Sequence, residues 1–343
     1  MNPCPFCSAS LRTYSARPSG AALLTCRQCL NPALAEPNAN GLQVTALAGY
    51  EDLRYRVQPG SVMEGMLHLL NKEINNLPVL PEAPRRVMAM VHDPIASTAD
   101  VAGVLNEDPV LSAQVFKMAN SAFYGGVEPI RELHVACARI GMRGVANVVQ
   151  ASAQSNLYKS KEAKFRQMIH DLWRHSVATA HATKLLAEES PALCPEQAFF
   201  AGLIHDIGKV LLLDLIAEKY TGPKGELRDS PELLARVIDA FHPLVGLHLT
   251  DRWNLPPEYG FTTFYSGAPE NCPIEEWTPL THAVCLGGRI SEVCGFGGAP
   301  SDNGGLDGHA SIGHLQLDDA TIAAVLQDVP EAVEELLDII EPV

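Results

Sequence analysis

Two pairs of cysteines near the amino terminus constrain the fold of this chain most strongly. Each pair has the form CxxC, and 18 residues separate the two pairs. Two residues between cysteines allow a tight turn to direct both sulfurs at one tetrahedral ion, and this spacing is typical of a four-thiolate zinc site. A segment this small is expected to fold only around its metal. We therefore predict a zinc ribbon over residues 1–35, with a hairpin between the pairs; the alternative is four unligated thiols. The predicted zinc ligands are Cys4, Cys7, Cys26 and Cys29.

The rest of the chain indicates a reducing compartment and gives no sign of a membrane span. The other five cysteines are scattered and odd in number, which argues against a disulfide framework. We find no apolar run approaching the roughly 18 residues of a spanning helix, and no basic-then-apolar secretion signal at the start. We expect a cytoplasmic protein without membrane contact.

Composition and charge limit the partners of the larger part of the chain. Hydrophobic residues make up 47% of the 343 residues and charged residues 19%, as in globular proteins. The net charge is −15, yet residues 1–60 hold five arginines against three carboxylates. The excess negative charge thus lies after residue 60, where it would repel nucleic-acid phosphates. The slightly basic ribbon could contact protein or nucleic acid.

Helical periodicity begins at Ser61, after a Pro- and Gly-rich segment that we interpret as a linker over residues 36–60. Capping patterns start at Ser61, Ser97 and Asp108. We predict a mainly α protein with one helical domain over residues 61–294, a Gly-rich loop at 295–311, and carboxy-terminal helices within 312–343 that pack on that domain. The longest predicted helices are Pro129–Tyr158, Phe165–Glu188, Glu196–Ile216 and Pro231–Trp253, and the last two are Asp318–Leu326 and Pro330–Ile340.

Seven segments between about residues 77 and 292 form an ordered pattern: LPVLPEAPRRVM at 77–88, NEDPVLSAQVFKMANSAFYGG at 106–126, ARIGMRGVANVV at 138–149, LWRHS at 172–176, AGLIHDIGKVLLL at 201–213, HPLVG at 242–246 and RWNLPPE at 252–258. Together they resemble the HDOD family, the HD-related output domains of bacterial signalling proteins. The resemblance implies a helical bundle of the HD-superfamily type. Within it, ANSAFYGG at 119–126 is a signature segment, in which Phe123 and Tyr124 would fill the core.

The HD resemblance also implies a metal site, which this chain matches in part. Members of the superfamily hold one or two ions with His and Asp, and this chain has four matching positions: His175, His205, Asp206 and His242. Imidazole and carboxylate ligands suit Fe, Mn or Zn. Equally, His175 and His205 could be core residues that are hydrogen-bonded to Asp206. Lys209 would either contact a phosphate or pair with Asp206, and pairing is favoured.

Two elements of the superfamily pattern are missing from this chain. Where relatives often carry paired histidines, the sequence reads Phe264-Tyr265-Ser266, and Gly288 stands where a late aspartate is expected. The loss of a carboxylate removes a ligand and a counter-charge, which places hydrolysis in doubt. An HD-type site without these ligands is better suited to recognising a partner or ligand than to hydrolysing a substrate.

Three functions remain open from the sequence. We favour a non-enzymatic signalling module that recognises a protein partner or a small nucleotide ligand. The alternative is a metal-dependent phosphohydrolase or phosphodiesterase acting on a nucleotide or cyclic dinucleotide, with His205, Asp206 and Lys209 as its catalytic residues. A third function is a nucleic-acid-associated regulator that uses the ribbon, against which the acidic body argues.

Overall fold

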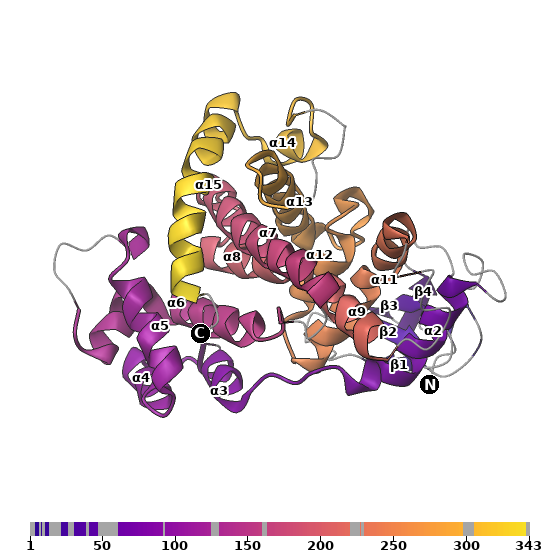
Figure 1. Ribbon diagram of the computed structural model, residues 1–343, viewed down its shortest axis with the longest axis horizontal. Coiled ribbons are helices and arrows are strands. Elements are labelled where there is room, and N and C mark those ends of the chain that lie inside the picture. Colours follow the sequence, from indigo (N-terminus) through magenta and orange to yellow (C-terminus); the bar gives the residue numbers. More distant parts are fainter. Residues whose placement is uncertain are drawn as a thin grey trace. The chain divides into compact units, whose positions relative to one another are not determined.

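A computed structural model describes the chain as two compact units with many helices, as the mainly α prediction required (Figure 1). One unit comprises residues 1–78 and 205–281, and the other comprises 79–204 and 282–343. This division differs from the predicted single body over 61–294, because residues 205–281 pack with the amino-terminal segment. The residues described are 4–6, 8, 11–13, 22–26, 31–38, 41–46, 61–91, 93–124, 130–159, 163–219, 227, 230–297 and 305–340.

The first unit contains a four-stranded antiparallel sheet in the order β1-β2-β3-β4. Strands β1 (Leu11–Thr13) and β2 (Ala22–Cys26) form the hairpin predicted between the cysteine pairs. Strands β3 (Pro32–Asn38) and β4 (Gly41–Ala46) continue the sheet beyond residue 35, into the segment expected to be a linker.

Helices form the rest of this unit, and side-chain caps start two of them. The Ser61 hydroxyl accepts a hydrogen bond from the Glu64 amide, and the Ser230 hydroxyl accepts one from Leu233. Such caps satisfy amide groups that have no partner inside the helix. The elements are α2 (Val62–Glu73), η1 (Ile74–Asn76), α9 (Ile207–Glu218), α11 (Pro231–Arg252), α12 (Pro257–Tyr265), η3 (Pro269–Asn271) and η4 (Glu275–Trp277).

The second unit is a helical bundle in which α8 and α15 both pack against α7. The predicted caps are confirmed: Ser97 and Asp100 form a reciprocal capping box, and Asp108 accepts from two amides of the next helix. Helix α6 is kinked at Gly141, where φ is 78°. The elements are α3 (Glu82–Val91), α4 (Thr98–Leu105), α5 (Pro109–Ala119), η2 (Ala122–Tyr124), α6 (Leu133–Ser155), α7 (Ala163–Glu188), α8 (Pro195–Ile204), most of α13 (Thr278–Val293), α14 (Ala310–Leu315) and α15 (Asp319–Ile340).

Helix α15 is one continuous helix where the sequence predicted two, so the predicted break at Pro330 is wrong. Proline has no amide hydrogen, and the carbonyl of Leu326, four residues earlier, therefore loses its helical donor. The thiol of Cys294 donates to that carbonyl, with Sγ 3.8 Å from the oxygen. The thiol supplies a replacement donor, which helps the helix to continue through the proline.

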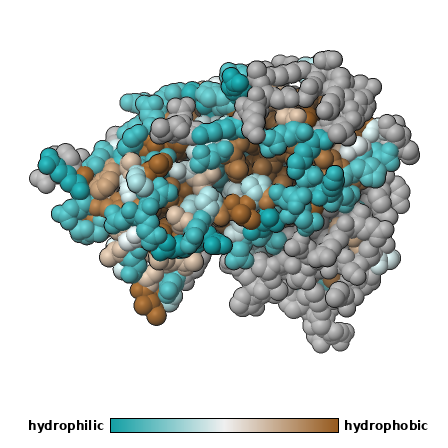
Figure 2. Space-filling model, turned by 60° about the horizontal axis from the view of Figure 1, so that its bottom comes forward, coloured by the Kyte–Doolittle hydropathy of each residue, from teal (hydrophilic) through white to brown (hydrophobic). Residues whose placement is uncertain are grey.

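Hydrophilic residues predominate on the coloured part of the face in Figure 2, with apolar residues in smaller groups between them. Such scattered exposure is ordinary for globular proteins and marks no docking site by itself. Among the helices that the structure describes, none combines the length and the apolar character needed to cross a bilayer.

Candidate functional site

His205 and Asp206 lie in a turn between two helices, where the sequence predicted one continuous helix. The prediction of Glu196–Ile216 as a single helix is wrong, because α8 ends at Ile204 and α9 begins at Ile207. Asp206 occupies the cap position of α9, with φ −104° and ψ 9°. Both side chains are buried, at 5% and 3% exposure.

Gly208 allows α9 to approach α11 closely beside this turn. A Cβ atom at Gly208 would lie 2.0 Å from the carbonyl oxygen of His242 and 2.9 Å from the amide nitrogen of Gly246. Both atoms belong to backbone, so a rotamer change could not relieve the clash. The glycine is therefore needed to bring His242 of α11 near Asp206.

The carboxylate of Asp206 is the centre of a cluster of four residues in the first unit. Lys209 Nζ lies 2.6 Å from Oδ2, which confirms the predicted pairing of these residues. His205 Nε2 lies 3.4 Å from the same oxygen, and His242 Nδ1 lies 3.9 Å from Oδ1. The last distance is too long for a hydrogen bond.

His242 is a largely buried imidazole that stays neutral at ordinary pH. Burial lowers the pKa of His242 to about 3; the negative charge of Asp206 acts in the opposite direction without overcoming it. Its Nδ1 atom is buried and has no hydrogen-bond partner among the described residues. An unpaired buried nitrogen beside a carboxylate is a suitable metal ligand. By donor chemistry, His205, Asp206 and His242 fit a first-row ion, which would share the carboxylate with Lys209.

His175 belongs to the other unit, in α7, and its ring orientation is fixed there. Its Nδ1 atom lies 3.0 Å from the carbonyl oxygen of Phe296 and 3.1 Å from Ser291 Oγ. Since a carbonyl can only accept, Nδ1 carries the proton, and Nε2 has the lone pair that could bind a metal. Metal-binding histidines often have this carbonyl contact. Ser291 and Phe296 were not predicted as site residues. Phe296 acts through its backbone carbonyl, which no sequence signal marks, and Ser291 lies 116 residues from His175 in the sequence.

The residues at the missing histidine positions belong to a hydrophobic cluster in the first unit. Tyr265 is 4% exposed and packs with Leu247, Phe261 and Leu34, the last of these on β3. Phe264 is partly buried against the same cluster. These positions therefore join α12 to the amino-terminal sheet.

The amino-terminal cysteines are described in part. Cys4 and Cys26 are both buried, at 2% and 0% exposure, and the Phe6 amide nitrogen lies 3.4 Å from Cys4 Sγ. A backbone amide directed at sulfur is suited to a thiolate, which accepts such bonds well. Cys7 and Cys29 lie outside the described residues.

Comparison with known proteins identifies the family to which this chain belongs. The HDOD domain family matches residues 77–269, more than half of the chain, and the chain belongs to this family. The predicted HDOD resemblance is therefore confirmed, whereas the zinc ribbon stays a prediction.

Relatives of known sequence or structure agree with the family and leave the activity open. An uncharacterized protein of Treponema pallidum is 26% identical over 220 residues; the match covers 62% of this chain but only 42% of that relative. The structure of an HDOD domain protein of unknown function from Geobacter sulfurreducens is 25% identical, with TM-score 0.62, and the match covers 80% of this chain and 98% of that one.

Two further structures share the fold at lower identity. A protein of Marinobacter aquaeolei, named as a candidate signal transduction protein, is 19% identical with TM-score 0.60, over 90% of this chain and 75% of that one. A protein of Shewanella amazonensis, named as a candidate metal-dependent phosphohydrolase, is 21% identical with TM-score 0.53. The match covers 76% of this chain and 99% of that one.

Proposed function

We propose that this chain is a regulatory module of a bacterial signalling pathway, which acts by recognising a protein partner or a small ligand without hydrolytic turnover. Membership of the HDOD family supports a signalling context, and the name of the Marinobacter protein of similar fold agrees with it. The choice of recognition over catalysis depends on the residues of the HD-type site.

The observation that carries the proposal is the packing of Tyr265. Where relatives often carry paired histidines, this side chain lies in an apolar cluster with Leu34 of β3 and Phe261. Its phenol oxygen is buried without a hydrogen-bond partner in the described part of the chain, and burial raises the pKa of Tyr265. A neutral phenol of this kind is a poor metal ligand. The position contributes to the attachment of the amino-terminal sheet instead.

The charge around Asp206 supports the same proposal. The ammonium group of Lys209 already neutralises this carboxylate. Gly288 of α13 adds no carboxylate where the family pattern has an aspartate. A divalent ion at His205 and Asp206 would have fewer anionic ligands than an HD hydrolase provides, and it would compete with Lys209.

A metal-dependent phosphohydrolase is the second candidate, and the unpaired Nδ1 of His242 favours it. If a metal were bound at His205, Asp206 and His242, it would supply Lewis acidity and an activated water. Lys209 would then hold a phosphate oxygen beside Asp206.

We also propose that Cys4, Cys7, Cys26 and Cys29 bind one zinc ion. The β1–β2 hairpin places Leu11 opposite Cys26, so the second pair of cysteines returns toward the first. Cys4 and Cys26 are both buried, as the ligands of an enclosed metal ion would be, and a segment this short is expected to fold around its metal. The ribbon would serve as a second contact surface for a partner.

Elemental analysis combined with turnover assays tests the proposed function. Purified full-length protein would be assayed with bis-p-nitrophenyl phosphate and cyclic dinucleotides, with Mn²⁺ or Fe²⁺ added. We expect about one zinc per chain and no metal-dependent turnover. Turnover that disappears in both His205→Ala and Asp206→Ala, with both variants still folded, would refute the non-enzymatic function.

A further inference from the structure

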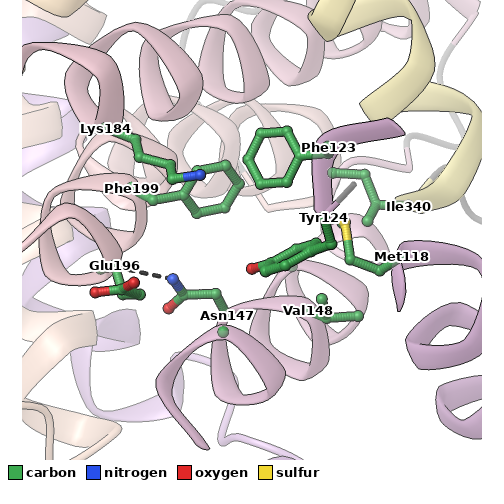
Figure 3. A pocket seen from close by; sticks show the side chains of 11 residues that line it. Met118, Phe123, Tyr124, Asn147, Val148, Lys184, Glu196, Phe199 and Ile340 are labelled. Carbon is green, nitrogen blue, oxygen red and sulfur yellow. Dashed lines mark hydrogen bonds between the residues drawn. The ribbon is translucent and has the colours of Figure 1, made fainter. Parts of the chain in front are cut away.

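The second unit contains a pocket whose lining includes none of the HD-type residues. The space between its lining atoms, counted together with the open solvent at its mouth, is about 360 Å³. Residues of η2, α5, α6, α7, α8 and α15 line it (Figure 3). Phe123, Tyr124 and Phe199 supply aromatic surface, and Met118, Val148 and Ile340 supply aliphatic surface. The sequence predicted that Phe123 and Tyr124 would fill a core, and they line this pocket instead.

Lys184 places a positive charge in this largely apolar wall. Its ammonium nitrogen lies 3.8 Å from the centre of the Phe123 ring, a cation–π contact. Its nearest described carboxylate is Glu188 at 3.5 Å, and that side chain is 43% exposed. The Lys184 side chain is itself 18% exposed. An ion pair with one exposed partner contributes modestly, and an ammonium has three N–H donors, so Lys184 keeps capacity for a further anionic partner.

Tyr124 places a hydroxyl donor at the same pocket. In Figure 3 this hydroxyl points toward the side where Asn147 and Glu196 lie. Burial, with the nearby charge of Glu196, raises the pKa of Tyr124 to about 12, so the hydroxyl stays protonated. Gly144 leaves room for it, because a Cβ there would lie 2.7 Å from the Tyr124 oxygen.

The remaining polar groups of the pocket are already engaged. The Asn147 amide donates to the carbonyl of Glu196 at 2.8 Å, and the Glu196 carboxylate accepts from the thiol of Cys194 at 3.2 Å. The position over the Phe123 ring that a bound cation would take is occupied by Lys184. Besides the Glu196 carboxylate, which is an acceptor, the groups left for a ligand are an ammonium and a phenol, both donors, between apolar surfaces.

We propose that this pocket binds a small organic monoanion, a carboxylate attached to a planar apolar body. The carboxylate accepts from Lys184 and Tyr124, and the apolar body lies among Phe123, Phe199 and Met118. The carboxylates of Glu188 and Glu196 disfavour a doubly charged group such as a phosphate monoester. The proposal goes beyond the proposed function, and it does not depend on whether the HD-type residues bind metal.

Titration calorimetry of the full-length protein tests this site with benzoate as the probe. Benzyl alcohol, benzylamine and phenyl phosphate serve as neutral, cationic and dianionic comparisons. We expect saturable binding of benzoate, about tenfold or more tighter than of any comparison compound, because a charge-assisted hydrogen bond is stronger than a neutral one.

Substitutions of the two proposed donors test whether benzoate binds in this pocket. Lys184→Met should weaken benzoate binding about tenfold, and Tyr124→Phe about threefold, since the latter removes one hydroxyl from a neutral donor. Lys159→Met, at an exposed position of the same unit, should leave it unchanged. Absence of saturable benzoate binding, equal binding of benzylamine or phenyl phosphate, or full affinity in folded Lys184→Met and Tyr124→Phe would overturn the proposal.

Discussion

The ammonium nitrogen of Lys209 lies 2.6 Å from Oδ2 of Asp206, whose side chain is only 4% exposed. Removal of the ammonium in Lys209→Met leaves a buried carboxylate without its nearest cation. Because Lys209 is 26% exposed, we expect a loss of about 2 kcal/mol in the free energy of unfolding, below the cost of breaking a fully buried pair.

The same variant should respond more strongly to added Mn²⁺. A ligand that binds the folded state stabilises it in proportion to occupancy, and an uncompensated carboxylate binds a divalent ion more tightly. Thermal unfolding with and without Mn²⁺ measures this, with Lys159→Met as the control. An equal Mn²⁺-dependent shift in Lys209→Met and wild type would show that the lysine and the ion do not compete for Asp206.

Gly208→Ala should be strongly destabilising, because the added methyl group would meet the backbone of His242 at 2.0 Å. Relief of this overlap requires α9 and α11 to move apart, at a cost of about 3 kcal/mol. Urea unfolding measures the change.

Gly103→Ala is the matched control for that substitution. Gly103 lies in α4, and a Cβ atom added there would have no atom within 4 Å. The helix propensity of alanine should therefore raise stability by about 1 kcal/mol. If Gly208→Ala were as stable as wild type, the close approach of α9 to His242 would not be required by the fold.

The helices of this chain could be predicted from local signals, and the errors arose where tertiary contacts override such signals. The caps at Ser97 and Asp108 depend on neighbouring residues, so they are visible in the sequence. The break at Pro330 was predicted from the same kind of signal, yet α15 continues, and the thiol of Cys294 donates to the Leu326 carbonyl that the proline leaves without its helical donor. No local pattern contains that contact.

The candidate site was predictable by residue type and less so by geometry. The resemblance identified His205, Asp206 and His242, and the pairing of Asp206 with Lys209 followed from their spacing. The turn that separates α8 from α9 was missed, because the apolar residues on both sides read as one helix. The role of Tyr265 in holding Leu34 of the sheet depends on packing between segments more than 200 residues apart.

The pair formed by His181 and Asp328 predicts a dependence of stability on pH. His181 Nε2 lies 2.6 Å from Asp328 Oδ1, and yet burial lowers the pKa of His181 more than the carboxylate raises it. The unfolded chain therefore takes up a proton before the folded protein does as pH falls. We expect this histidine to lower the free energy of unfolding progressively from about pH 6.5 downward, with no effect above it.

Urea unfolding between pH 7.5 and 5 tests this prediction by comparing the free energy of unfolding of wild type with that of His181→Gln. Wild type should lose stability faster than the variant over this range. His170→Gln, at an exposed position of the same helix, is the control and should follow wild type. A larger acid loss in His181→Gln than in wild type would reverse the sign and contradict a lowered pKa.

Removal of zinc should affect the amino-terminal sheet before the helices. Cys4→Ser replaces a buried thiol with a weaker zinc ligand, so we expect the zinc content to fall from about one per chain to near zero, and amide exchange in β1 and β2 to accelerate. Cys272→Ser, outside both cysteine pairs, should keep its zinc. Because Leu34 of β3 packs against Tyr265, loss of the metal should also loosen α12, and faster exchange there would reveal the coupling. Full zinc content in folded Cys4→Ser would exclude the four-thiolate site.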